Sequence, residues 1–364
     1  MYKIVRYPFT ENRSLQPWSA ADELLLDWVE NRRNDNETCA LFNDRFGYLG
    51  TMLHGRNPWH IVGYKSQEKA LCINLKNNGL VVDDKKIIYL PEKLPFTVDL
   101  ALVRVPKSME LFKMFLYLIS QKSHEKTQVV CGFMTRYFTP QMLRTAELFF
   151  HGVEQSKARK KARLLILKGP KEMRDTVEIL ETVTWNGLKL QQYAGVFSAS
   201  KVDFATRFLL ENFEAKAEEQ KILDLASGNG IIARFIYEKY QNRKFPLPEL
   251  HLLDDAVLAI ESSKLNMPFK NVHFHWDDTL DSLPEDYFDL IITNPPFHFE
   301  HEINTEVSLK LFREAYDRLH RKGRFVLVFN RHLAGYRKIL KQLFKSVKLM
   351  ADSPKYQIWE CRKV

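Results

Sequence analysis

Cysteine is scarce in this chain of 364 residues, which contains four. Cys39, Cys72, Cys131 and Cys361 are far apart, lie mostly within apolar runs and show no metal-ligand spacing. The spacing excludes a metal site built from cysteine pairs and favours reduced, buried thiols. We therefore expect no metal site.

Long apolar runs are also absent. No stretch approaches the ~18 uninterrupted apolar residues of a membrane span, and residues 1–6 lack the apolar core of a secretory signal. These absences exclude a membrane protein and favour a cytoplasmic one. The length is too great for one ordinary domain and ample for a large core.

The most informative motif is Asn294-Pro295-Pro296-Phe297, which follows an apolar run, residues 288–293, typical of a buried strand. Two prolines cannot continue a sheet ladder, so they end the strand and present the Asn294 side chain and the Pro295 carbonyl at its mouth. With Phe297 beside them, these acceptors suit a planar amine on a base taken out of its stack. The motif predicts methylation of an amino group, although by itself it fits a strand-ending turn with a core Phe equally well.

Upstream, an apolar strand at residues 221–225 enters a loop of small residues that ends at Gly230, before a helical pattern at residues 231–240. Glycines there let the backbone approach a ligand closely. A plain β–α turn has the same appearance, so the loop alone is weak evidence. The next strand-like run ends in Asp254, about 30 residues after the first strand, where an acid can bind a ribose.

Further strands are expected at residues 272–276 and 324–330, the latter after a helix at residues 308–319. Strands alternating with helices predict a parallel, doubly wound α/β sheet. The last two strand-like runs, residues 346–351 and 356–362, are separated by only four residues. So short a link requires an antiparallel hairpin.

With these motifs, residues 193–364 resemble a class I S-adenosylmethionine-dependent methyltransferase. The resemblance implies a Rossmann-like, seven-stranded sheet with a reversed last strand, and S-adenosyl-L-methionine as the cofactor. Asp254 would then bind the ribose hydroxyls and Asp278 the adenine amine. The loop residues that would hold the methionine part are Asp224, Ala226, Gly228 and Gly230. The cofactor carries no phosphate, which fits the lack of a cationic residue between positions 224 and 233.

The first half repeats the strand and turn pattern of the second half but lacks the residues expected to bind cofactor and substrate. Residues 38–47 have the strand and turn of residues 222–230, but large side chains occupy the loop. Gly63 stands where Asp254 offers its acid, and Arg104 stands at the position of Asn294. This pattern indicates two tandem methyltransferase domains, the N-terminal one degenerate and without cofactor, although any two doubly wound domains share some periodicity.

A linker is expected near Trp185-Asn186-Gly187, which gives a degenerate, RNA-recognising domain at residues 1–187 and a catalytic domain at residues 188–364.

Positive charge is concentrated in the first half. The chain has a net charge of +9, and residues 1–190 hold 29 Lys or Arg against 21 Asp or Glu. The densest basic cluster consists of Lys157, Arg159, Lys160, Lys161 and Arg163. Such a cluster is the electrostatic footprint of a polyanion such as RNA, and a solvated charged face is the alternative.

Nearly the whole chain is similar to the bacterial ribosomal RNA guanine-N2 methyltransferases, which pair a degenerate N-terminal domain with an active C-terminal one. In the second half the similarity is carried by residues 294–298 with His301, residues 196–198 with Asp203, and residues 330–333. In the first half it is carried by residues 16–23, 43–47, 105–107 and 160–163, which resemble the large-subunit type more closely. The resemblance implies a guanine in large-subunit (23S) ribosomal RNA as substrate. It also places His298 on the substrate side, with no proton transfer assigned to it or to His301.

Two positions depart from the family pattern. Ala226 replaces the first glycine of the loop, where a β-carbon clashes if φ is positive, and Lys201-Val202 replaces Gly-Leu before Asp203. A non-catalytic RNA-binding protein with a lost cofactor site therefore stays open as an alternative, as does a small-subunit (16S) enzyme. An adenine-N6 DNA or a protein glutamine methyltransferase is disfavoured, but the motif at residues 294–297 does not exclude either.

Overall fold

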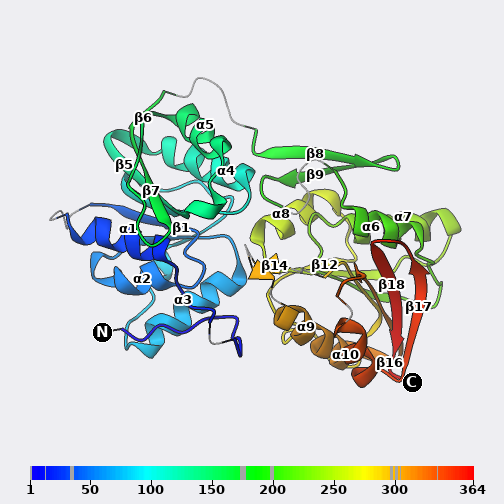
Figure 1. Ribbon diagram of the computed structural model, residues 1–364. Helices are drawn as coiled ribbons and strands as arrows, with labels where there is room; N and C mark the ends of the chain where they lie inside the picture. Colours follow the sequence, from blue (N-terminus) through cyan, green and yellow to red (C-terminus); the bar gives the residue numbers. More distant parts are fainter. Residues whose placement is uncertain are drawn as a thin grey trace. The chain divides into compact units, whose positions relative to one another are not determined.

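The computed structural model describes residues 2–12, 14–32, 37–172, 178–196, 201–295, 298–299, 302–303, 305–333 and 335–364. The chain divides into two compact units, Met1–Ile179 and Leu180–Val364 (Figure 1). No helix in the described ranges is long and apolar enough to cross a membrane. All four cysteines are free thiols; three are buried and Cys72 is partly buried.

The first unit contains a mixed sheet flanked by helices. Its strands are β1 (Cys39–Phe42), β2 (Trp59–Val62), β3 (Ile87–Tyr89), β4 (Val98–Arg104), β5 (Ser123–Met134), β6 (Phe150–Gln155) and β7 (Ala162–Pro170). Its helices are α1 (Ala20–Glu30), α2 (Tyr48–Met52), α3 (Lys65–Asn77), α4 (Met109–Ser120) and α5 (Pro140–Phe149), with short 3-10 helices at His54–Arg56, Asp84–Lys86 and Thr135–Tyr137. The strand order is β3-β2-β1-β4-β5-β7-β6, and β7 is antiparallel to both of its neighbours.

The second unit repeats this architecture. Its strands are β8 (Leu180–Trp185), β9 (Leu188–Tyr193), β10 (Lys221–Leu225), β11 (Glu249–Asp254), β12 (Val272–Trp276), β13 (Phe288–Thr293), β14 (His298–Phe299), β15 (Glu302–Ile303), β16 (Leu319–Asn330), β17 (Ser346–Asp352) and β18 (Tyr356–Arg362). Its helices are α6 (Phe204–Glu211), α7 (Ile231–Arg243), α8 (Val257–Asn266), α9 (Thr305–Arg318) and α10 (Gly335–Leu343). The main sheet has the order β12-β11-β10-β13-β16-β18-β17, and β18 is antiparallel to β16 and β17. Two tandem α/β domains, and in the second a seven-stranded sheet with a reversed last strand, are thus confirmed. The main sheet of the first unit also has seven strands.

Successive side chains of the central strands point to opposite faces of the second sheet, and both faces are buried, as is typical of parallel sheets. Ile222 and Leu290 belong to the core that includes α6 and α7. Leu223 and Ile291 belong to the core that includes α9 and α10. The carboxyl ends of β10, β11 and β13 therefore form one edge between two packed layers, where open α/β sheets bind ligands.

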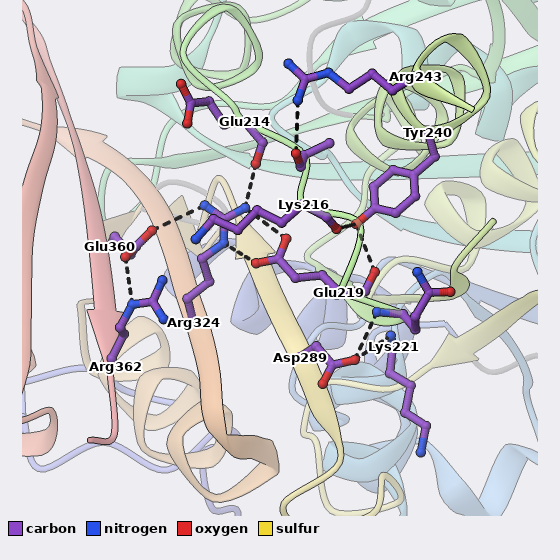
Figure 2. A network of polar contacts seen from close by, with 12 residues as sticks. Glu214, Lys216, Glu219, Lys221, Tyr240, Arg243, Asp289, Arg324, Glu360 and Arg362 are labelled. Carbon is purple, nitrogen blue, oxygen red and sulfur yellow. Dashed lines mark hydrogen bonds and ion pairs between the residues drawn. The ribbon is translucent and has the colours of Figure 1, made fainter. Parts of the chain in front are cut away.

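At the opposite, amino-terminal end of these strands, a buried ion network holds the sheet to the segment before β10 (Figure 2). The Arg324 guanidinium on β16 donates to the Glu219 carboxylate at 2.5 and 2.9 Å and to Glu360 on β18 at 3.2 Å. Nearby, the Asp289 carboxylate accepts from the backbone N–H groups of Gln220 and Lys221, both at 3.0 Å. Because its buried charges are paired, the network has a structural role.

The division between the two compact units lies a few residues before the predicted linker. Trp185-Asn186-Gly187 lies at the turn of the hairpin formed by β8 and β9, and Asn186 and Gly187 have positive φ of 48° and 80°. An Asn-Gly pair with both φ values positive is the preferred two-residue hairpin turn. The hairpin belongs to the second unit, so the two units divide between residues 179 and 180.

Candidate functional site

Asn294 follows the carboxyl end of β13, and its side-chain amide is hydrogen-bonded through the nitrogen alone in the described part of the chain. Its Nδ2 donates to Asp203 Oδ2 at 3.1 Å and to Thr206 Oγ1 at 3.0 Å. Its Oδ1 is buried and has no hydrogen-bond partner in the described part of the chain. An unsatisfied buried acceptor costs about 1–3 kcal/mol, so Oδ1 is suited to receive a donor from a ligand.

Asp203 both starts α6 and orients the Asn294 amide. As the N-cap of α6 its carboxylate accepts from the backbone N–H groups of Ala205 at 2.9 Å and Thr206 at 3.3 Å. A carboxylate only accepts hydrogen bonds, so it selects the NH2 side of the neighbouring amide and turns Oδ1 away. The family pattern includes Asp203 but assigns it no role, and it does not indicate Thr206. An Asp N-cap before an apolar helix is the sequence signal that points to both.

The loop after β10 lies beside this group. Thr293 Oγ1, next to Asn294, donates to the Leu225 carbonyl at 2.6 Å, which ties the ends of β13 and β10 together. Ala226, Gly228 and Gly230 follow with positive φ of 59°, 56° and 79°. A β-carbon on Gly228 would meet no atom within 4 Å, so the surroundings of this glycine are open.

Two buried carboxylates support the loop. Asp224 Oδ2 accepts from the backbone N–H of Ala233 at 3.0 Å, while its Oδ1 is buried without a described partner. Asp254 Oδ2 accepts from the Gly228 N–H at 2.9 Å, and its Oδ1 accepts from the Ala256 N–H at 2.9 Å. Burial raises the pKa of Asp224 well above its ordinary value and that of Asp254 to about 6. Burial thus disfavours the ionised form of both acids, and hydrogen bonds from amino and hydroxyl groups of a ligand would stabilise that form.

The turn after β12 brings Asp278 to the same edge. The backbone N–H of Asp277 donates to the Asp254 carbonyl at 3.2 Å, and that of Asp278 donates to Asp277 Oδ1 at 2.8 Å. Asp278 therefore follows a residue that is bonded to the end of β11.

The β8–β9 hairpin stabilises the loop after β10 through hydrogen bonds, a role that the sequence did not indicate. Asn229 Nδ2 donates to Gln192 Oε1 at 2.8 Å. Asn266 Nδ2, on α8, lies 2.8 Å from the carbonyl oxygens of both Asn229 and Gln191. Loop, hairpin and α8 are thereby held as one polar cluster.

Part of the predicted substrate side falls outside the described residues, namely Pro296, Phe297 and His301. Pro295 is buried at the end of β13, and His298 begins the short strand β14.

The corresponding loop of the first unit is filled by side chains. By the sheet registers, Arg45 stands at the position of Gly228. Its guanidinium carbon lies 3.8 Å from the centroid of the Tyr64 ring, and Nη2 donates to Ser66 Oγ at 3.2 Å. Asn43, at the Ala226 position, has φ of 60°. The first unit therefore keeps the turn of the cofactor loop, but the Arg45 side chain occupies the space that is open beside Gly228.

The registers also test the residue matches between the two units. Phe42 pairs with Val103 as Leu225 pairs with Thr293, so Arg104 does stand at the position of Asn294. Arg104 binds Asp22 Oδ1 through Nε at 2.7 Å. The match of Gly63 to Asp254 is wrong by one residue, because the pairing of Phe42 with Ile61 and of Leu225 with Leu253 puts Val62 there. An apolar side chain replaces the acid.

The basic cluster lies on the connection from β6 to β7, with Arg163 at the start of β7. Arg159 forms an ion pair with Asp27 and Lys160 with Glu23 at 2.7 Å, both acids on α1. Arg163 Nη1 donates to Gln155 Oε1 at 3.0 Å. Exposed Lys157 and Lys161 have no ion pair within the described ranges, so the positive charge available here is smaller than the sequence suggested.

Two family descriptions match the chain: "RLMG N-terminal domain" over residues 1–172 and "Methyltransferase small domain" over residues 187–360. Among curated relatives, the ribosomal RNA large subunit methyltransferase G of Shewanella frigidimarina is 30% identical and that of Shewanella oneidensis 29% identical. Each alignment covers 99% of this chain and 97% of the relative. A solved structure of the 16S rRNA N2 G1207 methyltransferase (RsmC) of T. thermophilus, in complex with AdoMet and guanosine, has the same fold. Its TM-score is 0.78 at 19% identity, over 100% of this chain and 98% of that one.

Proposed function

This chain belongs to the family of ribosomal RNA large subunit methyltransferase G, and from that premise we propose that it transfers a methyl group from S-adenosyl-L-methionine to the N2 amine of a guanine in large-subunit (23S) ribosomal RNA. The observation that supports this reaction best is the Asn294 amide, whose Oδ1 is a buried acceptor without a partner in the described chain. An exocyclic amine supplies the N–H donor that this acceptor lacks.

Orientation of the amine is the main catalytic task. The cofactor, when bound, supplies an electrophilic methyl group on a sulfonium, and the displacement is in line. The guanine N2 lone pair is delocalised into the ring. Hydrogen bonds from N2–H to Asn294 Oδ1 and to the Pro295 carbonyl localise the lone pair and aim it outward, while Phe297 stacks on the base. His298 contacts the substrate from the strand that follows.

The residues around the glycine loop fit the cofactor. Asp224 Oδ1 and Ser227 Oγ are buried without described partners, as expected for a site that receives polar groups of a ligand. Asp224, Ala226, Gly228 and Gly230 would hold the methionine part. Asp254 would accept from the ribose hydroxyls through the second lone pairs of its oxygens, and Asp278 from the adenine amine. No cationic side chain is required, because the cofactor has no phosphate.

The first unit would serve RNA recognition. Arg45 occupies its loop, and Val62 and Arg104 replace the two polar residues of the active copy, so we assign it no cofactor. The RNA contacts would come from the β6–β7 connection, where Lys157 and Lys161 offer the unpaired charge. Arg159 and Lys160 would act with part of their charge neutralised by Asp27 and Glu23. Arg163 would keep its full charge, because its partner Gln155 is neutral. Because ribosomal RNA is the proposed substrate, we propose a cytoplasmic location.

The direct test is to incubate the purified full chain with tritiated S-adenosyl-L-methionine and ribosomal RNA from cells that lack the gene. The labelled nucleoside is then identified in each subunit RNA. Label as N2-methylguanosine in 23S RNA is the expected result. The same label confined to 16S RNA would overturn the choice of subunit, and no label together with no cofactor binding by calorimetry would favour a non-catalytic RNA-binding protein.

Asn294→Ala separates the amine-orienting role from folding. We expect this variant to lose methyl transfer and to keep its dissociation constant for the cofactor, because Nδ2 and Oδ1 of Asn294 make no bond to the glycine loop among the described contacts. Wild-type turnover in this variant would refute the amine-orienting role of Asn294.

The RNA surface is tested by reversing two charges. Lys157→Glu with Lys161→Glu should weaken RNA binding and lower the slope of log affinity against log salt by about 0.7–0.9 for each phosphate that is no longer neutralised. Lys85→Glu with Lys93→Glu is the matched control, since both lysines are exposed in the first unit and the change in net charge is equal. Equal effects from the two pairs would show that only net charge matters.

A further inference from the structure

A cluster of histidines lies at the outer edge of the second sheet, away from the carboxyl ends that carry the proposed active site. Glu249 and His251 alternate along β11, and His273 and His275 alternate along β12. In this parallel pair His251 stands opposite His273. Alternation by two puts all four side chains on one face of the sheet.

Three of these side chains turn their ligand atoms toward one point. Glu249 Oε1 lies 3.0 Å from His251 Nε2 and 3.1 Å from His273 Nε2, and the three atoms all lie within 4.8 Å of one another. Ligands about 2.0–2.1 Å from a tetrahedral zinc ion are separated by roughly 3.3 Å. The three atoms can therefore reach one ion with small side-chain movements.

We propose that Glu249, His251 and His273 bind a divalent transition-metal ion, with zinc as the best match to two imidazole nitrogens and one carboxylate oxygen. Three protein ligands leave the fourth position of a tetrahedral ion to water. His251 is nearly buried and His273 is about half exposed, with side-chain exposures of 9% and 47%, so an ion can enter from solvent.

Neighbouring groups orient the ligands. His251 Nδ1 lies 2.9 Å from His275 Nε2, and the Tyr287 hydroxyl donates to Glu249 Oε2 at 3.0 Å, which leaves Oε1 for the ion. Metal-bound histidines usually donate their other ring N–H to a carboxylate, a backbone carbonyl or water, and here the His275 ring nitrogen takes the place of that acceptor. With its proton on Nδ1, His251 donates to His275 and presents the Nε2 lone pair toward Glu249 and His273.

The same contacts without metal would be a hydrogen-bond network, in which Glu249 Oε1 accepts N–H groups from both histidines. The two states differ in where the His251 proton lies and in whether an ion cross-links β11 to the edge strand β12. His251 lies three residues before Asp254, about 10 Å along the strand at ~3.3 Å per residue. The site is thus separate from the proposed methyl transfer and would hold the edge of the sheet together.

The test is a Zn2+ titration of the tag-free full chain, stripped with EDTA and desalted, against a chromogenic chelator. We expect one ion per chain, a higher melting temperature with Zn2+, and a Co2+ complex with the strong visible absorption of tetrahedral coordination. His273→Ala should weaken Zn2+ binding at least tenfold, and its partial exposure makes misfolding a small concern.

His320→Ala is the control, because His320 is an exposed histidine of the same unit outside the cluster. Glu249→Gln keeps the shape of the site and removes the anionic ligand, so it should also lose affinity. The proposal is overturned if micromolar Zn2+ does not bind, or if His273→Ala and Glu249→Gln bind it as tightly as the wild type does.

Discussion

The contact between Asp203 and Asn294 yields a sharp prediction about catalysis. Asp203 caps α6 and accepts from Asn294 Nδ2 at 3.1 Å. In Asp203→Ser, serine keeps the capping preference, but its shorter hydroxyl no longer selects the orientation of the Asn294 amide. Thr206 Oγ1 remains at 3.0 Å and cannot select it, since a hydroxyl both donates and accepts.

The magnitude follows from the hydrogen bond that is removed. A hydrogen bond to a charged group contributes about 1.5–3 kcal/mol, and about 1.4 kcal/mol is a factor of ten in rate. We therefore expect Asp203→Ser to lower kcat for methyl transfer by roughly 10- to 100-fold. The dissociation constant for S-adenosyl-L-methionine should stay within a factor of about three, because the hydrogen bond that is removed does not involve the cofactor loop.

The assay is single-turnover methyl transfer with enzyme in excess over RNA, beside calorimetric cofactor binding. Asp83→Ser is the matched control, since Asp83 is an exposed N-cap aspartate of the 3-10 helix at Asp84–Lys86, in the other unit. In an Asn294→Ala background, Asp203→Ser should cost nothing further, because both changes remove one function. Unchanged kcat in Asp203→Ser, or losses that add in the double variant, would refute the orienting role.

Three further predictions concern the cofactor loop and the core. Burial raises the pKa of Asp254 to about 6, and hydrogen bonds from the ribose hydroxyls favour the ionised acid. Cofactor affinity should therefore fall as the pH drops below 6. Calorimetric titrations over a pH series should show this fall in the wild type and no pH dependence in Asp254→Asn. The positive φ of Ala226 costs about 1 kcal/mol in an L-residue, so Ala226→Gly should raise the free energy of unfolding in urea by about that amount, whereas Ala233→Gly, inside α7, should lower it. Arg324→Met leaves the buried Glu219 without its counterion, while Glu360 keeps its ion pair with Arg362. The substitution should lower the free energy of unfolding by about 3–5 kcal/mol, and a loss below 1 kcal/mol would contradict the pairing.

The pH prediction for Asp254 also has a stability side. A carboxyl whose pKa is raised by folding favours the folded state most below its unfolded pKa, and this contribution is lost as pH rises through the folded value. Between about pH 4 and 6 the cofactor-free protein should therefore lose stability from this group as pH rises. Donors from a bound cofactor reverse part of that loss, so cofactor should stabilise the protein more at pH 7 than at pH 5.

The sequence by itself determined the fold class and, in the second half, the order of the seven main strands along the chain. Apolar runs alternating with helical patterns, and the four residues before the last strand, specify a parallel sheet with a reversed end. The duplication was also visible, down to Arg104 at the position of Asn294. These features are readable because strand period, turn chemistry and loop length are local properties of the chain.

Tertiary structure decided everything that depends on which distant residues meet. Asn-Gly at 186–187 proved to be a hairpin turn, and only packing showed that the hairpin holds Asn229 through Gln192. The orientation of the Asn294 amide, which leaves Oδ1 without a partner in the described chain, depends on the Asp203 carboxylate 91 residues away. Glu249, His251 and His273 converge because the β11–β12 register sets His273 opposite His251, two residues along β11 from Glu249. Such contacts follow from register and packing between segments far apart in the chain, which local sequence patterns do not specify.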